Sequence, residues 1–118
     1  MRMLSNFLTQ EQIKYLVDNF NFKFKECNTL SIIHICDMIP PTIKIGEVEY
    51  YWRLVRLNKD LWEISYINLN YIEDKKNINP VLHSESNFCV INALFNMLVW
   101  CLKNDYIIKD VLKENNYI

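Results

Sequence analysis

The longest apolar stretch of the chain covers residues 87–104, NFCVINALFNMLVWCLKN. From position 88 to 102 its only polar residues are Asn92 and Asn96, which lie four apart and therefore share one narrow stripe of a helix. The stretch is too long for an ordinary strand and too short for a membrane span, which takes about 20 such residues. A helix that is apolar almost all round has to be buried almost all round. The pattern therefore predicts a central helix that lies on a sheet and has its back covered by another element.

A second helix is predicted near the N-terminus. Thr9 and Gln12 have the spacing of a capping box, in which each side chain bonds the backbone amide of the other residue. Apolar residues then follow at i, i+3, i+4 and i+7 and form one face: Ile13, Leu16, Val17 and Phe20. Such a helix can cover either the back of the central helix or one edge of the sheet.

Residues 28–38 carry signals for two states. The β-branched isoleucines in this segment favour a strand. Asn28 as an N-cap and the stop at Pro40-Pro41 favour a short helix. We interpret the segment as a helix.

Alternation of apolar and polar residues predicts an antiparallel sheet in the middle of the chain. Residues 42–45 alternate and lead into Gly46-Glu47, a pair typical of a tight turn. Residues 48–55 and 61–68 then form two longer strands, which a turn at residues 58–60 joins. The expected sheet therefore contains at least one long hairpin.

The hydrophobic pattern also predicts the register of this hairpin. Pairing Leu57 opposite Leu61 places the large residues of both strands on one face, as a one-sided core requires. That pairing sets the other inward-facing residues opposite one another: Ile64 with Leu54, and Tyr66 with Trp52.

The segment between the hairpin and the central helix is mostly polar. We interpret residues 68–80 as a wide hairpin loop and residues 81–84 as a further strand. Ser84 or Ser86 is then expected to cap the central helix. After that helix, apolar residues between positions 107 and 112 suggest a last short helical turn.

Together these elements predict an α+β fold: a small antiparallel sheet of three to four strands packed against a buried C-terminal helix, with an N-terminal helix. The chain has 118 residues, of which 51 % are apolar and 23 % are charged, and this composition suits a single domain of residues 1–118. The net charge of −1 implies no broad attraction to nucleic acid or to anionic lipid. Nucleic-acid and membrane partners are therefore not expected.

The cysteine pattern favours a reducing compartment. The chain has four cysteines, and no two of them form a C-x-x-C pair: Cys27, Cys36, Cys89 and Cys101. Residues 1–8 lack the apolar run of a secretory signal. We therefore expect reduced thiols in a cytoplasmic protein. Cys27, Cys36 and His34 are the only local set of metal ligands, and their spacing makes a poor chelate.

The sequence offers no convincing catalytic site. Gly46 is the single glycine, which excludes phosphate-cradling loops and nucleophile elbows. On a strand His83 shares a face with Glu85 but not with Ser84, so a histidine–carboxylate pair is expected and a triad is not. His34 lies in an apolar run, where a hydrogen-bonded core or edge histidine is expected. We predict no enzymatic activity, no cofactor and no bound metal.

Aromatic residues crowd the predicted hairpin: Tyr50, Tyr51, Trp52, Trp62, Tyr66 and Tyr71. Aromatic side chains on an open sheet can stack on single-stranded bases. That function also needs interleaved basic residues, and only Arg53 and Arg56 lie among them. Because core packing accounts for Trp52, Trp62 and Tyr66, single-stranded nucleic-acid binding is an alternative and not the first hypothesis.

Two surfaces remain as candidate protein interfaces. One is the face of the sheet opposite the large residues, where apolar and charged side chains mix and Glu63 lies diagonal to Arg53. The other is the side of the central helix that points away from its sheet-facing stripe, which forms an apolar patch if the first helix leaves it uncovered. The candidate residues are Tyr51, Arg53, Val55 and Ile67 on the sheet, and Phe95, Val99 and Trp100 on the helix.

The order of features from Ile39 to Ile107 resembles that of a group of small, functionally uncharacterised proteins of phages and mobile elements of gut bacteria. The shared layout is a Pro-terminated segment, an I-x-I strand, a Y-x-W/L hairpin, a W-x-x-S-Y strand and a closing A-L-x-x-M-L-x-W-L helix. In this chain the features are, in order, Ile39-Pro40, Ile43-Lys44-Ile45, residues 50–54, residues 62–66, and a helix with Ala93, Leu94, Met97, Leu98, Trp100 and Leu102.

This resemblance implies an accessory protein of the bacterial host cytoplasm without assigned catalytic residues. Our first hypothesis is a non-catalytic protein-interaction protein, an accessory factor or inhibitor, that docks on a host or phage protein or forms a homodimer. A small virion or structural component is an alternative, and so is the single-stranded nucleic-acid binder described above.

Overall fold

The computed structural model describes residues 6–23, 30–68 and 80–118. In chain order its elements are α1 (Gln10–Phe20), α2 (Ile32–Met38), β1 (Thr42–Ile45), β2 (Val48–Arg56), β3 (Trp62–Ile67), β4 (Val81–Asn87), α3 (Val90–Lys103) and α4 (Lys109–Glu114). The strands form one antiparallel sheet in the order β1-β2-β3-β4. The predicted α+β fold is confirmed, and the sheet has four strands.

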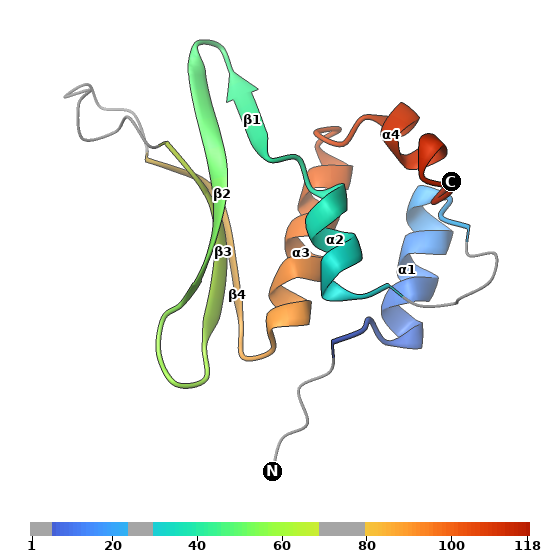
Figure 1. Ribbon diagram of the computed structural model, residues 1–118, viewed down its shortest axis with the longest axis horizontal. Coiled ribbons are helices and arrows are strands. Elements are labelled where there is room, and N and C mark those ends of the chain that lie inside the picture. Colours follow the sequence, from blue (N-terminus) through green and yellow to red (C-terminus); the bar gives the residue numbers. More distant parts are fainter. Residues whose placement is uncertain (1–5, 24–29, 69–79) are drawn as a thin grey trace.

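The helices of the described chain all lie on the same side of the sheet (Figure 1). Of these, α3 packs directly on β3 and β4, and α2 packs on α3. Residues on several sides of α3 are wholly buried: Ala93, Leu94, Met97, Leu98 and Cys101. The prediction of a buried central helix laid on a sheet is confirmed, and its back is covered by α2 as well as by α1.

The amphipathic helix α1 contacts the polar stripe of α3. Its predicted capping box is present, because Gln12 N–H donates to Thr9 Oγ1 and Thr9 N–H donates to Gln12 Oε1. Gln12 also donates through Nε2 to Asn92 Oδ1 at 2.8 Å. A single glutamine thus stabilises the start of α1 and satisfies a polar side chain of the otherwise apolar α3.

The register of the long hairpin is the predicted one. Leu57 N–H donates to the Leu61 carbonyl at 2.8 Å, and the inward-facing pairs follow from it: Leu54 with Ile64, and Trp52 with Tyr66. The predicted turn between β1 and β2 is also present. Gly46 has φ of 62°, a left-handed conformation that glycine adopts without strain.

Two details of the predicted elements are wrong. Ser84 and Ser86 do not cap the central helix, because both lie within β4, which continues to Asn87; α3 begins after Cys89. The short helix α2 starts after Ser31, whose Oγ accepts from His34 N–H, and the expected cap Asn28 lies outside the described residues. The helical interpretation of this segment is confirmed for Ile32–Met38.

Most of the predicted loop at residues 68–80 also lies outside the described residues. Its two ends meet, since Asn68 N–H donates to the Pro80 carbonyl at 2.8 Å. The strands that it joins, β3 and β4, are antiparallel neighbours.

Candidate functional site

The seven predicted interface residues fall on two separate surfaces of the molecule. Those on strands lie on the side of the sheet away from the helices, and those on α3 line a groove between α1, α3 and β4. The structure therefore does not bring all seven together.

The first surface is the open face of the sheet, by which we mean Tyr51, Arg53, Val55, Ile67, Glu63 and Ser65. Direct cross-strand pairs place these residues side by side: Tyr51 with Ile67, Arg53 with Ser65, and Val55 with Glu63. Arg53 is exposed, Tyr51 is 37 % exposed, and Val55 and Ile67 are half-buried. The helices of the described chain leave this face uncovered (Figure 1).

Hydrogen bonds and charge shape the open face. Ser65 is buried at the centre of the face, and its Oγ donates to Glu63 Oε1 at 3.0 Å. The nearby carboxylate of Glu49 raises the pKa of Tyr51, so this phenol stays protonated and keeps its O–H donor. The open face thus combines apolar area with a phenol, a guanidinium and a carboxylate.

The second surface is a groove of about 340 Å³, which we call the aromatic groove. It is lined by Tyr15, Glu85, Phe95, Asn96, Val99, Trp100 and Lys103. The three predicted residues in it are half-buried. The ring of Tyr15 on α1 contacts that of Phe95 with centroids 6.2 Å apart, so the first helix covers part of the patch and leaves the rest as the groove.

Trp100 is held in place by neighbouring rings. His83 stacks on it with centroids 4.3 Å apart and an interplanar angle of 2°, and Tyr106 lies at 5.1 Å. His83 Nε2 in turn pairs with the carboxylate of Glu85, as the shared strand face predicts. Sequence reasoning missed the stacking of His83 on Trp100, because nothing in the spacing of two residues on different elements indicates it.

The remaining histidine caps a helix, and the described cysteines form no disulfide. Of the two expected settings for His34, core or edge, the core is excluded because the side chain is exposed; its Nδ1 accepts from Ser31 N–H at 3.0 Å and completes the cap of α2. Cys36, Cys89 and Cys101 are free thiols. Cys27 lies outside the described residues, and within those residues no three His, Cys, Asp or Glu side chains are grouped closely enough to hold a metal ion.

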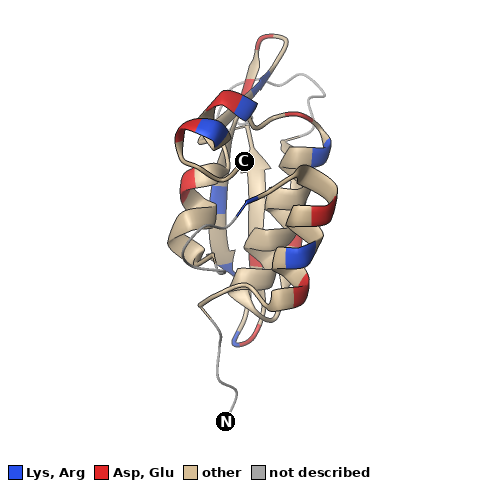
Figure 2. Ribbon diagram, turned by 90° about the vertical axis from the view of Figure 1, so that its right-hand side faces the viewer, with Lys and Arg blue, Asp and Glu red and all other residues tan. Residues whose placement is uncertain are grey.

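The surface charge and the lengths of the helices bear on nucleic-acid and membrane binding. Acidic and basic residues are interspersed over the helices that face the viewer in Figure 2, which gives this side no broad region of one sign. Among the described residues no helix is both long enough and apolar enough to span a bilayer.

Comparison of the chain with protein-family models, with curated protein sequences and with solved structures finds no match.

Proposed function

We propose that the protein is a non-catalytic interaction protein, an accessory factor or inhibitor, that docks on a partner protein through the open face of the sheet. The observation that carries this proposal is the one-sided arrangement of the helices, which leaves the face of the sheet with Tyr51, Val55 and Ile67 uncovered by any described helix. Tyrosine and arginine are enriched where protein interfaces concentrate their binding energy, and the open face presents Tyr51 beside Arg53.

The open face suits docking better than the aromatic groove does. Trp100 already contacts the rings of His83, Tyr106 and Tyr66, so a partner would gain little of its area. The residues of the open face belong to two strands whose register is fixed by hydrogen bonds, and rigid presentation lowers the entropy cost of binding.

The placement of the hairpin aromatics also favours a protein partner over single-stranded nucleic acid. Tyr50 and Tyr66 are buried, and Trp52 faces the helices together with Tyr66. Trp62 lies on the same face of β3, with the Arg56 guanidinium 5.8 Å from its ring centre. Tyr71 lies outside the described residues, so Tyr51 is the described hairpin aromatic that remains for base stacking.

Affinity capture from a bacterial lysate tests the proposal. The tagged protein and an Arg53→Glu variant are compared, with Lys14→Glu as a matched charge reversal on the exposed side of α1. We expect a protein that is retained by the wild type and by Lys14→Glu and lost with Arg53→Glu. Capture that is equal for all three proteins, or no capture at all, contradicts docking through the open face.

Solution mass and a DNA titration separate the other functions. A wild-type dimer that Arg53→Glu converts to monomer identifies the partner as a second copy, whereas large assemblies support a structural component. A salt-dependent shift with single-stranded DNA supports the nucleic-acid alternative, and its absence removes that alternative.

A further inference from the structure

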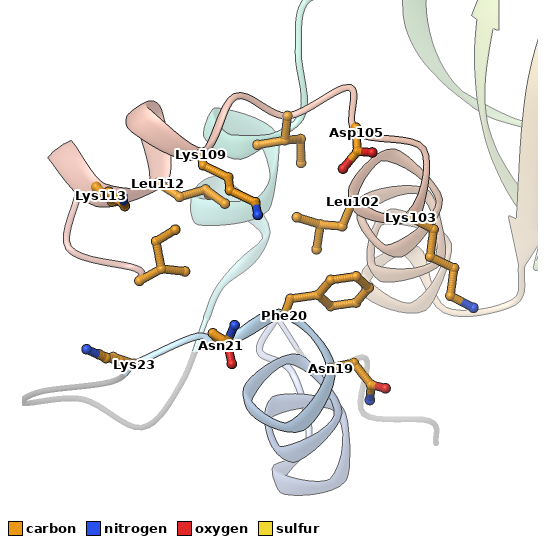
Figure 3. A pocket seen from close by; sticks show the side chains of 12 residues that line it. Asn19, Phe20, Asn21, Lys23, Leu102, Lys103, Asp105, Lys109, Leu112 and Lys113 are labelled. Carbon is orange, nitrogen blue, oxygen red and sulfur yellow. The ribbon is translucent and has the colours of Figure 1, made fainter.

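We propose that a cavity between α1, α3 and α4 binds a small amphipathic anion, a carboxylate carried on a short apolar chain. The cavity measures about 540 Å³ and lies where the C-terminal ends of α1 and α3 meet α4 and the last residues of the chain (Figure 3). Its volume falls within the roughly 300–1,000 Å³ typical of small-molecule sites. The cavity is separate from the open face of the sheet, so the inference does not rest on the proposed function.

One part of the cavity wall is apolar. Its apolar members are Phe20, Leu102, Ile107, Leu112 and Ile118. Of these, Ile107 and Leu112 belong to the buried core, which makes that part of the wall firm. A backbone hydrogen bond also joins the segment after α1 to the C-terminal segment, since Lys23 N–H donates to the Tyr117 carbonyl at 2.6 Å. Transfer of a ligand's apolar chain from water to this wall would be favourable because it buries apolar surface.

The polar part of the wall is strongly basic. It contains Lys23, Lys103, Lys109 and Lys113 against a single acid, Asp105. This local excess stands out because the whole chain has a net charge of −1. Within the described residues none of the four ammonium groups forms an ion pair, and Figure 3 shows the side chains of Lys23 and Lys103 directed away from the cavity.

The positions of the lysines on their helices single out Lys109. Lys103 and Lys113 lie in the last turns of α3 and α4, where a cation is favoured by the partial negative charge of the helix end. Lys109 is instead the first residue of α4, where the helix offers a cation no such stabilisation. Figure 3 shows its side chain extending into the cavity, toward the space between Leu102, Leu112 and Phe20. We therefore assign Lys109 as the group that binds the carboxylate.

Binding of octanoate to the full chain, followed by ¹⁵N NMR titration, tests the site. Octan-1-ol supplies the chain without the charge, and acetate supplies the charge without the chain. We expect octanoate to shift the amide signals of Asn21, Asp105 and Lys113, and each control ligand to bind at least about tenfold more weakly, since each lacks one of the two complementary halves.

Two variants separate the role of Lys109 from a general effect of charge. Because Lys109→Gln removes one charge-assisted hydrogen bond at an exposed position, we expect octanoate to bind roughly threefold to tenfold more weakly. Lys14→Gln removes an exposed lysine that does not line the cavity and should leave the affinity unchanged. The proposal is overturned by no binding of octanoate, by equal binding of octanol, by signal shifts centred on the aromatic groove, or by equal affinity of Lys109→Gln and wild type.

Discussion

At the scale of single residues, Tyr66 is a buried side chain that contacts several parts of the fold. It is wholly buried, and its ring packs 6.1 Å from that of Trp100 on α3. Its hydroxyl donates to the Pro40 carbonyl at 2.7 Å and accepts from the Cys101 thiol at 3.8 Å. Burial raises the pKa of Tyr66 well above its usual value, so the phenol stays a donor. One residue of β3 thus links the segment after α2 to the central helix.

Replacing Tyr66 by Phe tests this link. The ring stays in the core, but the Pro40 carbonyl loses its donor, so we expect the free energy of unfolding to fall by about 1–2 kcal/mol. Urea unfolding measures the change. Tyr51→Phe is the matched control, because that phenol is partly exposed, and we expect a change within about 0.5 kcal/mol. Equal losses for the two variants would contradict the role of the buried hydroxyl.

The Cys101 thiol is the second residue with a distinct prediction. Burial raises its pKa from 9.0 to about 12, so the folded protein keeps the proton over a range in which the unfolded chain loses it. Because the unfolded state then binds fewer protons, stability should fall as pH rises above 9.0, with a slope of at most about 1.4 kcal/mol per pH unit from this group. In a Cys101→Ala variant, the free energy of unfolding measured with urea should decline less steeply with pH between these two pKa values.

The same burial predicts low chemical reactivity. In the folded protein at about pH 8, iodoacetamide should label the half-buried Cys89 well before Cys101, because the thiolate is the nucleophile. Peptide mapping by mass spectrometry measures both rates, and unfolding in urea should make them similar. Labelling of Cys101 at the rate of Cys89 in the folded protein would show that the α3–β3 interface opens readily.

At the scale of elements, the β1–β2 hairpin depends on one backbone conformation. Gly46 has φ of 62°, and no atom lies within 4 Å of the position that a Cβ would take, so a side chain there meets only backbone strain. Gly46→Ala should lower the free energy of unfolding by about 1 kcal/mol, whereas Gly46→Asn should cost less because asparagine tolerates the left-handed region. Urea unfolding of both variants measures the difference. An alanine variant as stable as the wild type would rule out the strain.

Elements with strong local signals were predictable from sequence, and those that depend on a partner were not. The capping box of α1 and the register of β2 with β3 follow from nearby residues and from alternation. The predicted strand at residues 81–84 stops short because the polar residues after it are typical of a loop, but Ser86 pairs with Glu63 of β3 and the strand continues to Asn87. The capping box of α2 has a histidine at the position where glutamate or glutamine is usual, so the sequence pattern did not indicate this cap.

The same distinction applies to the candidate sites. The open face of the sheet was predictable, because a strand register places alternate residues on one side. The stacking of His83 on Trp100 joins two different elements, and the basic cavity lies where three helices meet, with members spread from Asn19 to Ile118. No spacing rule connects such residues, so only the assembled fold brings them into view.

At the scale of the whole molecule, the helices stabilise one face of the sheet and leave the other to the solvent or to a partner. This division assigns different roles to the two surfaces that the sequence offered as candidate interfaces. Trp100 packs between β3, β4 and the segment before α4, whereas Arg53 projects from the side of the sheet away from the helices. The aromatic groove should therefore matter for stability and the open face for binding.

Alanine variants of Trp100 and Arg53 test this division of roles. Trp100→Ala removes a half-buried indole and three ring contacts, so we expect unfolding to become easier by about 2–3 kcal/mol. Arg53→Ala removes an exposed side chain and should change stability by no more than about 0.5 kcal/mol. Both variants are measured by urea unfolding and by partner capture. If the division is correct, Trp100→Ala loses stability and, where it is folded, still captures its partner. Arg53→Ala keeps its stability and captures less of the partner. The reverse pattern would indicate that the partner docks at the aromatic groove and not at the open face.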